Sequence, residues 1–523
     1  MVRKLILLVG FLTFGFAQAQ DMPLEYRFGE KYKDRFKYSN LLTFTETTSG
    51  EKILVRAYYT GILLRPKGYL IERYNQELEL IDEYNYKFRD GDFVHGFVAN
   101  GLVNLIFLTY NQEKLVYEYT VHQSPVGAYN FTVKSLLIIA AEQVDQPLDK
   151  NYFNRNFKSG FTTTILADPD ARTFSISILR KHKKILQHRV LVFNNQLRKI
   201  LDVDFSAPSE EKNYAFEEMA VSPDLSSVYL VGKAYFKKRK FKGGERRYQY
   251  ELFRLSSTGI QALIFDEPGK FSEAIKPLWR DGKLVCAGFY ADRKDNRYNG
   301  LQYFMVNPQT LSVLKRKYHP FSEQFMFDKF GNQTDRPIKN LVFKGAHFTE
   351  DGSLLFNAEE FFVTESMQSN ASGGRVRIER HHHNDIVSVK LDPQGELVWA
   401  RNINKTEVTQ GDSAYTSYSS YTSDGQTYFF ICSSAEEPQV INNQRVLFKQ
   451  GFSRRRNVFV IRLDSGGEMS YEKVMDASEA RLPLMVSKPL VNNEEDRLLF
   501  YAKQGSRKQL VSIAVRGESI LAE

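Results

Sequence analysis

Two strand–turn–strand patterns recur along the 523-residue sequence. In the first, an alternating strand leads through a tight acidic turn into an apolar strand: EEMAVSPDLSSVYLVG (217–232), GAHFTEDGSLLFNAEE (345–360) and SSYTSDGQTYFFICSS (419–434). In the second, a four-residue turn joins two strands: DIVSVKLDPQGELVWARNI (385–403), NVFVIRLDSGGEMSYEKVM (457–475) and YELFRLSSTGIQALIFDE (250–267). Asp, Pro and Gly suit such turns for different reasons: Asp accepts hydrogen bonds from the turn backbone, Pro has a fixed φ, and Gly can adopt a positive φ. In chain order the two patterns form a four-stranded antiparallel meander, whose strands we call A, B, C and D.

This meander repeats about eight times, and the copies lie at 40–87, 92–140, 160–206, 214–267, 272–320, 338–404, 413–476 and 481–521. Repeated four-stranded meanders at this spacing are typical of β-propellers. A β-helix would show shorter repeats, and an array of sandwiches would show linkers. We therefore predict an all-β fold, a single β-propeller of seven to eight four-stranded antiparallel blades over 39–523. The preceding segment, 20–38, contains PLEYRFG (23–29), a candidate strand for completing the last blade and closing the ring.

Short turn motifs also carry a family resemblance. SPD (222–224), EDG (350–352) and SDG (423–425) resemble the WD40-like (PD40) repeats of TolB-type propellers. KLDPQGELVWARN (390–402) is similar to the strand–turn–strand of quinoprotein-like secreted bacterial propellers. The resemblance implies the propeller fold and carries no functional residues across, because propellers host many unrelated activities.

The N-terminus has the layout of a secretory signal peptide. Residues 1–19 combine a basic start, a short apolar run and small residues at Ala17 and Ala19. The run is too short to span a bilayer, and no later run is long and apolar enough. We therefore expect export, to the periplasm, the cell surface or the extracellular space.

Basic residues gather in the B–C loops, and YFKKRKFKGGERRYQY (235–250) is the richest example. In a meander the B–C and D–A connections share one face, whereas the A–B and C–D turns, which carry mostly acidic residues, share the other. Solvation of exposed loop tips is one explanation of the charge. The functional interpretation is a docking face for an acidic partner: an envelope or surface protein, an anionic glycan or lipopolysaccharide. Its candidate residues are Lys181, Lys183, Lys184, Lys237, Lys238, Arg239, Lys240, Lys242, Arg246, Arg247, Arg375, Arg377, Arg380, His381, His383, Arg454, Arg455 and Arg456.

An exported chain is not expected to bind nucleic acid, and no nucleic-acid-binding module is recognisable. We expect a monomer outside any complex and no cofactor. Cys286 and Cys432 both lie in apolar, strand-like runs, which favours buried free thiols and leaves a disulfide open.

No catalytic motif of the common hydrolase, nucleotide-binding or metalloprotease types is present. The cluster RHHHND (380–385) could place His381 and His383 on one side of a strand with Asp385, but an exposed basic hairpin explains it more simply. We therefore expect a non-catalytic binding or scaffolding module. The alternative is a hydrolase or lyase acting on an envelope or extracellular polymer through carboxylates at the central channel, for which Glu217 and Glu218 are candidates.

Overall fold

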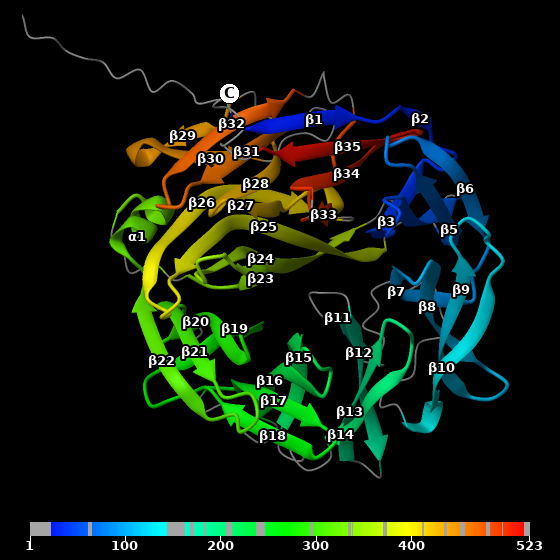
Figure 1. Ribbon diagram of the computed structural model, residues 1–523, viewed down its shortest axis with the longest axis horizontal. Helices are drawn as coiled ribbons and strands as arrows, with labels where there is room; N and C mark the ends of the chain where they lie inside the picture. The colour runs from blue at the N-terminus through cyan, green and yellow to red at the C-terminus, as the bar shows by residue number, and fades with distance from the viewer. Residues whose placement is uncertain are drawn as a thin grey trace, which may run out of the picture.

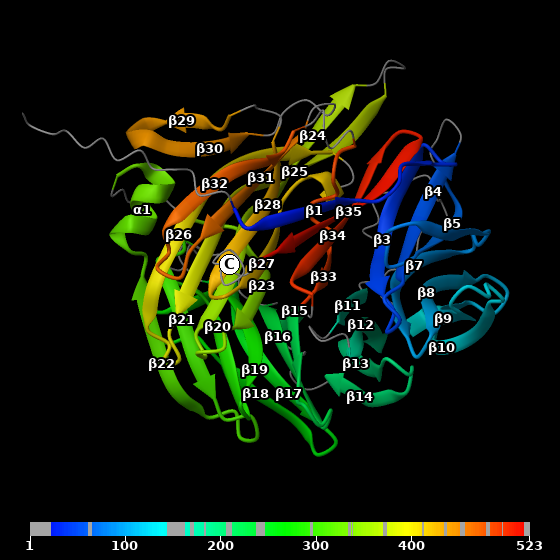
Figure 2. The ribbon, with the colours of Figure 1, turned by 45° about the horizontal axis from the view of Figure 1, so that its top comes forward.

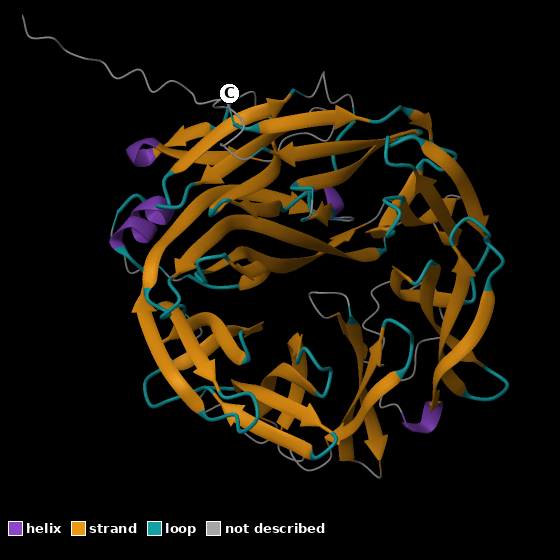
Figure 3. Ribbon diagram, in the orientation of Figure 1, coloured by secondary structure: helices purple, strands orange, loops and turns teal. Residues whose placement is uncertain are grey.

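The computed structural model describes residues 22–60, 65–143, 163–167, 172–182, 185–205, 212–236, 246–292, 297–332, 336, 338–369, 374–410, 413–433, 437–449, 456–476, 482–493 and 495–516. Within this part the chain forms eight β-sheets, and each contains four antiparallel strands side by side. Figure 1 shows the sheets arranged in a ring, and Figure 3 shows how little of the chain is helical. This is the arrangement of a β-propeller, and we number the sheets as blades 1 to 8 in chain order.

Blades 1 to 5 are regular meanders with the inner strand first and the outer strand last. Blade 1 contains β3 (Tyr38–Glu46), β4 (Lys52–Thr60), β5 (Arg65–Tyr74) and β6 (Leu80–Tyr86). Blade 2 contains β7 (Gly91–Ala99), β8 (Leu102–Asn111), β9 (Val116–Pro125) and β10 (Thr132–Ala140), followed by the 3₁₀ helix η1 (Ala141–Gln143). Blade 3 contains β11 (Thr163–Ala167), β12 (Thr173–His182), β13 (Ile185–Asn194) and β14 (Lys199–Phe205). Blade 4 contains β15 (Lys212–Val221), β16 (Ser227–Phe236), β17 (Tyr248–Ser256) and β18 (Gly259–Ile264). Blade 5 contains β19 (Phe271–Arg280), β20 (Lys283–Ala291), β21 (Gly300–Val306) and β22 (Val313–Pro320).

The last three blades include the extra strands of the fold and the site where the two ends of the chain pair. Blade 6 contains β23 (Leu341–Phe348), β24 (Leu354–Ser369), β25 (Arg375–Leu391) and β26 (Leu397–Thr409). Blade 7 contains β27 (Ser419–Ser423), β28 (Gln426–Ser433), β31 (Asn457–Leu463) and β32 (Met469–Met475), with the 3₁₀ helix η2 (Ser413–Tyr415) before it. Blade 8 contains β33 (Leu490–Asn492), β34 (Arg497–Gln504) and β35 (Arg507–Val515). Each blade falls on one of the eight repeat units read from the sequence.

The hydrophobic core lies between neighbouring blades. The two middle strands of a blade are packed on both faces, so they read as continuous apolar runs; KLVCAGFYA of β20 is buried at every position after Lys283. Tyr229 and Leu252 of blade 4, for example, belong to one cluster with Cys286 and Phe304 of blade 5. Cys286 and Cys432 are both buried and free, as the sequence favoured.

The two ends of the chain meet in blade 8. β1 (Leu24–Phe28) runs antiparallel to β35 as the outer strand, with Leu24 opposite Val515, and β2 (Tyr32–Lys33) pairs further along β35. The segment that the sequence offered as a ring-closing strand therefore occupies that position. The N-terminal segment therefore supplies the outer strand of the last blade, and this pairing ties the two ends of the chain together.

Blade 6 departs from the regular pattern. β24 and β25 are 16 and 17 residues long, and Figure 2 shows their ends extending past the neighbouring strands. A hairpin from blade 7 joins the outer edge: β30 (Arg445–Lys449) pairs parallel with β26, and β29 (Gln439–Ile441) pairs with β30 around η3 (Asn442–Gln444). α1 (Glu323–Phe330), capped by Ser322 and ended by Gly331 in the left-handed region, packs on β26. The basic B–C loop predicted for this blade is the projecting end of this long hairpin, and α1 was not predicted.

The acidic residues of the A–B and C–D turns have a structural role in several blades. Asp224 and Asp351 accept hydrogen bonds from the backbone N–H groups of Ser226 and Ser353 in their own turns, and Asp392 and Asp464 do the same in the C–D turns. A tight turn needs such a cap, whereas a long B–C loop does not. Turn chemistry therefore explains part of the charge difference between the two faces.

Candidate ligand-binding pocket in the channel

The inner strands of the blades line the centre of the ring (Figure 1). Five of them carry a β-bulge against their neighbour, between Leu41 and Thr43, Phe93 and His95, Phe216 and Glu218, Ser272 and Ala274, and Phe343 and Gly345. A bulge leaves one residue unpaired and redirects its side chain. In blades 4, 5 and 6 that residue is charged: Glu217, Glu273 and Lys344.

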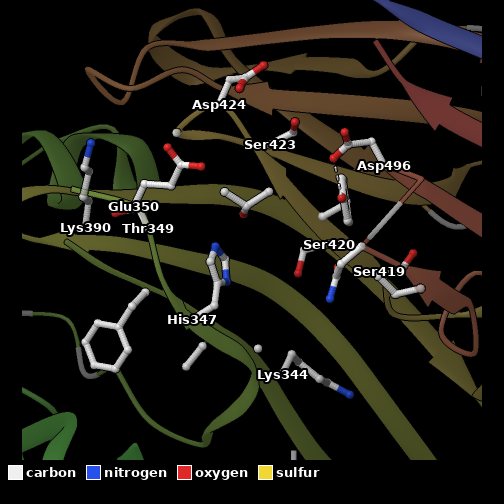
Figure 4. A pocket seen from close by; sticks show the side chains of 18 of the residues that line it. Lys344, His347, Thr349, Glu350, Lys390, Ser419, Ser420, Ser423, Asp424 and Asp496 are labelled. Carbon is white, nitrogen blue, oxygen red and sulfur yellow. Dashed lines mark hydrogen bonds between the residues drawn. The ribbon is translucent and has the colours of Figure 1, made fainter. Parts of the chain in front are cut away.

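A pocket of about 1030 Å³ opens between the inner strands of blades 6, 7 and 8. Its walls come from β23 and β27, and its mouth from the A–B turns that follow β23, β27 and β33. Hydroxyl side chains are frequent in these walls, and the most prominent are Thr349, Ser419, Ser420, Ser423 and Ser487. Figure 4 shows Thr349 on one side of the cavity and Ser419, Ser420 and Ser423 on the other, with His347 between them.

The mouth of the pocket is acidic. Glu350, Asp424 and Asp496 stand in the A–B turns of three consecutive blades, and Figure 4 shows all three at this end. Asp496 accepts a hydrogen bond of 2.8 Å from Tyr421 Oη. Glu350 and Asp424 are exposed and make no ion pair with any described residue. These two carboxylates are therefore available to a ligand, unlike the turn-capping Asp351.

The opposite end of the pocket rests on a buried ionic network. Lys344, which lines the pocket, places Nζ 3.2 Å from Glu359 Oε2. The same carboxylate accepts hydrogen bonds from Ser417 Oγ at 2.8 Å and from Lys405 Nζ at 3.1 Å, and His383 Nδ1 lies 3.0 Å from it. Burial by itself would raise the pKa of Glu359, but the charge of Lys405 and the hydrogen bond from His383 hold that pKa at about 2. Glu359 is therefore a fixed anion that orients Lys344.

Several polar atoms in the pocket wall have no hydrogen-bond partner among the described residues. They are Nε2 of His347, Oη of Tyr418 and Oγ of Ser419. Tyr418 and Ser419 are 4% and 7% exposed, so these polar atoms lie behind the surface of the pocket wall. Burial also lowers the pKa of His347, so its imidazole is neutral at pH 7. The groups that a ligand can reach are instead the half-buried hydroxyls of Thr349 and Ser423 and the exposed carboxylates of the mouth.

The channel carboxylates named from the sequence lie in blade 4, away from this pocket. Glu217 Oε2 accepts a hydrogen bond of 2.9 Å from Tyr250 Oη, while Glu218 Oε2 pairs with Lys276 Nζ of blade 5 at 2.7 Å. Reduced solvation within the channel wall raises the pKa of Glu217. The two carboxylates have separate partners and do not form an acid–base pair.

Many of the basic residues proposed for docking lie outside the described residues: Lys183, Lys184, Lys237, Lys238, Arg239, Lys240, Lys242, Arg454 and Arg455, as does the side chain of Lys181. Residues 1–19, which hold the expected signal peptide, lie outside them too. The docking face therefore stays a prediction at these positions. No helix among the described residues is long and apolar enough to cross a membrane.

The described members of the basic set fall into two groups. Arg246 is buried and donates to Glu273 at 2.6 Å, and Arg456 donates to the backbone carbonyl of Tyr415 at 2.6 Å. These side chains, with the buried His383, serve internal contacts. Arg247 and Arg375 are exposed, and Arg377, Arg380 and His381 lie half-buried on the projecting hairpin.

The histidine cluster does not form a metal site. His381 and His383 share a face of β25, opposite Val363 and Phe361, as alternation predicts. A register shift follows His383, and Asp385 instead pairs with Lys329 Nζ at 2.6 Å. No cluster of three or more His, Cys, Asp or Glu side chains suited to a metal is found in the described ranges.

The residues of the pocket were missed in the sequence even though their segments were noticed. GAHFTEDG and SSYTSDG were recognised as repeats of one turn pattern, and these two segments form the facing walls of the pocket. The signal that sets them apart is composition: six of the seven residues 419–425 carry a hydroxyl or a carboxylate. The β-bulge that leaves Lys344 unpaired has no comparable signal in the sequence.

No protein-family model matches the chain, and no curated protein matches it. Among solved structures, it is similar to a prolyl endopeptidase (9% identity, TM-score 0.31, 66% of this chain and 46% of that one). It is also similar to the acylaminoacyl peptidase of Pyrococcus horikoshii (8%, 0.32, 79% and 60%) and to an α-L-arabinanase of Penicillium chrysogenum complexed with arabinobiose (10%, 0.31, 71% and 100%). The chain thus spans about half the length of the first protein and 60% of the second. Likenesses at these scores carry no conclusion about activity.

Proposed function

We propose that this protein is an exported β-propeller that binds a polar, amine-bearing segment of an extracellular or envelope polymer in the channel pocket. The observation that carries the proposal is the pair of uncommitted carboxylates, Glu350 and Asp424, at the mouth of a hydroxyl-lined pocket of about 1030 Å³. Pockets of this size hold several sugar rings or amino-acid residues.

Charge selects the ligand at the mouth. Four carboxylates line the pocket against two lysines, and one of those lysines, Lys344, is held by Glu359. A ligand with a protonated amine meets a favourable potential as it enters, while a polyanion is repelled. Hydroxyl groups of the ligand then meet the half-buried hydroxyls of Thr349 and Ser423 in the pocket wall.

Glucosamine oligomers and their N-acetylated counterparts test this directly, because they differ in charge and share a backbone. We expect calorimetric titration to show binding of the cationic oligomers only, weakening with added salt. The double substitution Glu350→Gln and Asp424→Asn should reduce affinity about tenfold, because each partly exposed charge contact contributes ~0.5–1 kcal/mol.

The matched control is Asp281→Asn. Asp281 occupies the same left-handed turn position in blade 5 as Asp424 in blade 7, with φ of 47° and 51°, and lies outside the pocket. Its substitution should leave affinity unchanged. Equal affinity of the wild-type protein and the double variant, or preference for the acetylated oligomers, would contradict the proposal.

The same samples test the alternative of a hydrolase or lyase. Chromatography after prolonged incubation would reveal shorter oligomers if the pocket cleaves its ligand. We expect the oligomers to remain intact, because Glu350 and Asp424 are exposed and no hydrogen bond from another described side chain holds either carboxylate in a fixed orientation. Cleavage by the wild-type protein that the double variant loses would establish the enzyme.

The basic docking face remains a second proposal, supported by the exposed Arg375 and Arg247 and by the composition of 237–242. It predicts recovery of an acidic envelope partner that is lost when Lys237, Lys238, Arg239 and Lys240 are neutralised together. Unchanged recovery and salt sensitivity would remove it.

A further inference from the structure

The projecting hairpin of blade 6 has one unprotected edge. Pairing of β23 with β24 ends at Leu341 opposite Glu360, and one more backbone hydrogen bond joins Phe361 N to the carbonyl of Asn340; from Phe362 onward the only strand paired with β24 among the described residues is β25. A two-stranded ribbon is marginally stable in water, and an unpaired edge is a template for another strand. The outer half of β24 is therefore a surface on which a further strand fits.

The two edges of this ribbon differ in charge. The outer half of β25 carries Arg375, Arg377 and Arg380, and charged side chains of this kind discourage strand pairing. Across 361–369, β24 carries a single charge, Glu365, whose carboxylate is bound by Arg377. The β24 edge is thus the one that pairing leaves open.

The pattern of side chains along this edge is self-complementary. Val363 and Met367 lie on one face, are 43% and 60% exposed, and stand symmetrically about Glu365. In an antiparallel pair of two β24 strands centred on Glu365, each Val363 faces the Met367 of the other copy. On the opposite face each Thr364 meets a Ser366, and hydroxyl pairs of this kind stabilise sheets. At the centre the two Glu365 side chains stand opposite each other, and each is paired with its own Arg377, which also lies 3.5 Å from Glu379, the residue opposite Glu365 on β25.

We propose that the β24 edge is a homodimer interface, in which two copies of this chain join their blade 6 hairpins into one four-stranded sheet about a two-fold axis. An isologous contact of this kind closes on itself and gives a dimer, not a fibre. The contact is small, so the dimer is weak and forms as concentration rises. The monomer expected from the sequence is the outcome that would contradict this proposal.

Sedimentation velocity over a wide concentration range tests the association. We expect the mass to rise from one chain towards two for the wild-type protein, and to stay at one chain for Met367→Lys, which puts a charge into the interface. Val133→Lys is the matched control, because Val133 is a similarly exposed residue (57%) on the outer strand of blade 2. It should dimerise like the wild type, and circular dichroism should show both variants folded.

Cysteine cross-linking tests the register. In the proposed pair the two copies of residue 365 lie about 5 Å apart, within reach of a disulfide, whereas the two copies of residue 367 are offset by about 13 Å along the strands. Glu365→Cys should therefore cross-link under mild oxidation and Met367→Cys should not; the native thiols are buried and do not interfere. A wild-type protein that stays monomeric at the highest concentration, or equal cross-linking of both variants, would overturn the interface.

Discussion

Removing the charge of Glu72 should weaken the seam that closes the ring. Glu72 lies in β5 of blade 1 and is completely buried; its carboxylate binds Arg56 of β4 and accepts a 2.5 Å hydrogen bond from Lys508 of β35 in blade 8. Arg56 also pairs with Asp34 of the N-terminal segment at 2.8 Å, and Lys503 of β34 binds the same Asp34 carboxylate. One buried network therefore joins the two blades that hold the ends of the chain.

The size of the effect follows from the charges that remain. In Glu72→Gln the buried cations of Arg56 and Lys508 lose their shared anion, and breaking a buried ion pair on one side costs about 3–5 kcal/mol. The unfolding entropy is about 2 cal/mol/K per residue, which gives roughly 1 kcal/mol/K for a chain of this length. The melting temperature should therefore fall by about 3–5 °C.

Scanning calorimetry at a fixed scan rate measures this shift, and Glu77→Gln is the control. Glu77 is exposed in the turn after β5, where a substitution should change stability by less than about 0.5 kcal/mol. The double variant Glu72→Gln with Lys508→Gln removes one charge of each sign, so it should be less destabilised than the sum of its single variants. Equal melting temperatures for Glu72→Gln and Glu77→Gln would refute the role of the network in closure.

Three further outcomes follow from buried groups. The pKa of Glu359 is about 2 in the folded protein, against an ordinary value of 4.5. The ionised carboxylate therefore stabilises the fold by about 3 kcal/mol above pH 4.5, and this stabilisation is lost as the pH falls towards 2. The difference in melting temperature between the wild type and Glu359→Gln should shrink over that pH range. Burial lowers the pKa of His122 to about 4, whereas the same histidine in the unfolded chain binds a proton below pH 6.5. The free energy of unfolding should therefore fall as the pH is lowered from 6.5 to 4. An NMR titration should give the low pKa, and His122→Gln should show a smaller fall in stability over the same range. Gly288→Ala should destabilise the protein by at least ~1–3 kcal/mol, because an added Cβ would lie 1.9 Å from the backbone oxygen of Ala274. In Gly101→Ala the added Cβ meets no neighbouring atom, so the only cost is that of a left-handed φ of 72° for alanine. Denaturant unfolding should show the larger loss of stability for Gly288→Ala.

The sequence predicted the blades well because each blade is a local object. Its strands are consecutive, its turns are closed by their own Asp and Gly residues, and its middle strands are apolar throughout. The additions to blade 6 could not be predicted in this way. The parallel pairing of β30 with β26 joins Asn404 to Leu447, and no local pattern records a contact across that distance in the chain.

The site was harder to predict than the fold for a related reason. The backbone conformation of its own turn decides whether an aspartate caps that turn or is left for a ligand. The sequence does not show this conformation, because Asp351 and Asp424 stand in the similar motifs EDG and SDG. Asp351 bonds Thr349 and Ser353 within its turn, whereas Asp424 takes the left-handed position itself, with φ of 51°, and caps nothing. Basic residues show the same ambiguity, because Arg246 belongs to the most basic stretch of the chain and is nevertheless buried against Glu273.

Blade 6 is the part of the ring where these features converge. Its inner strand β23 forms one wall of the pocket, Glu359 of β24 fixes Lys344 beneath the pocket, and the outer halves of β24 and β25 carry the proposed dimer edge. His383 of β25 contacts the Glu359 carboxylate and lies opposite Phe361, where the projecting ribbon begins. A strand added at the outer edge would therefore brace the same two strands that hold the pocket floor. The dimeric wild-type protein should therefore bind the ligand more tightly than the monomeric Met367→Lys variant, although Met367 lies outside the pocket.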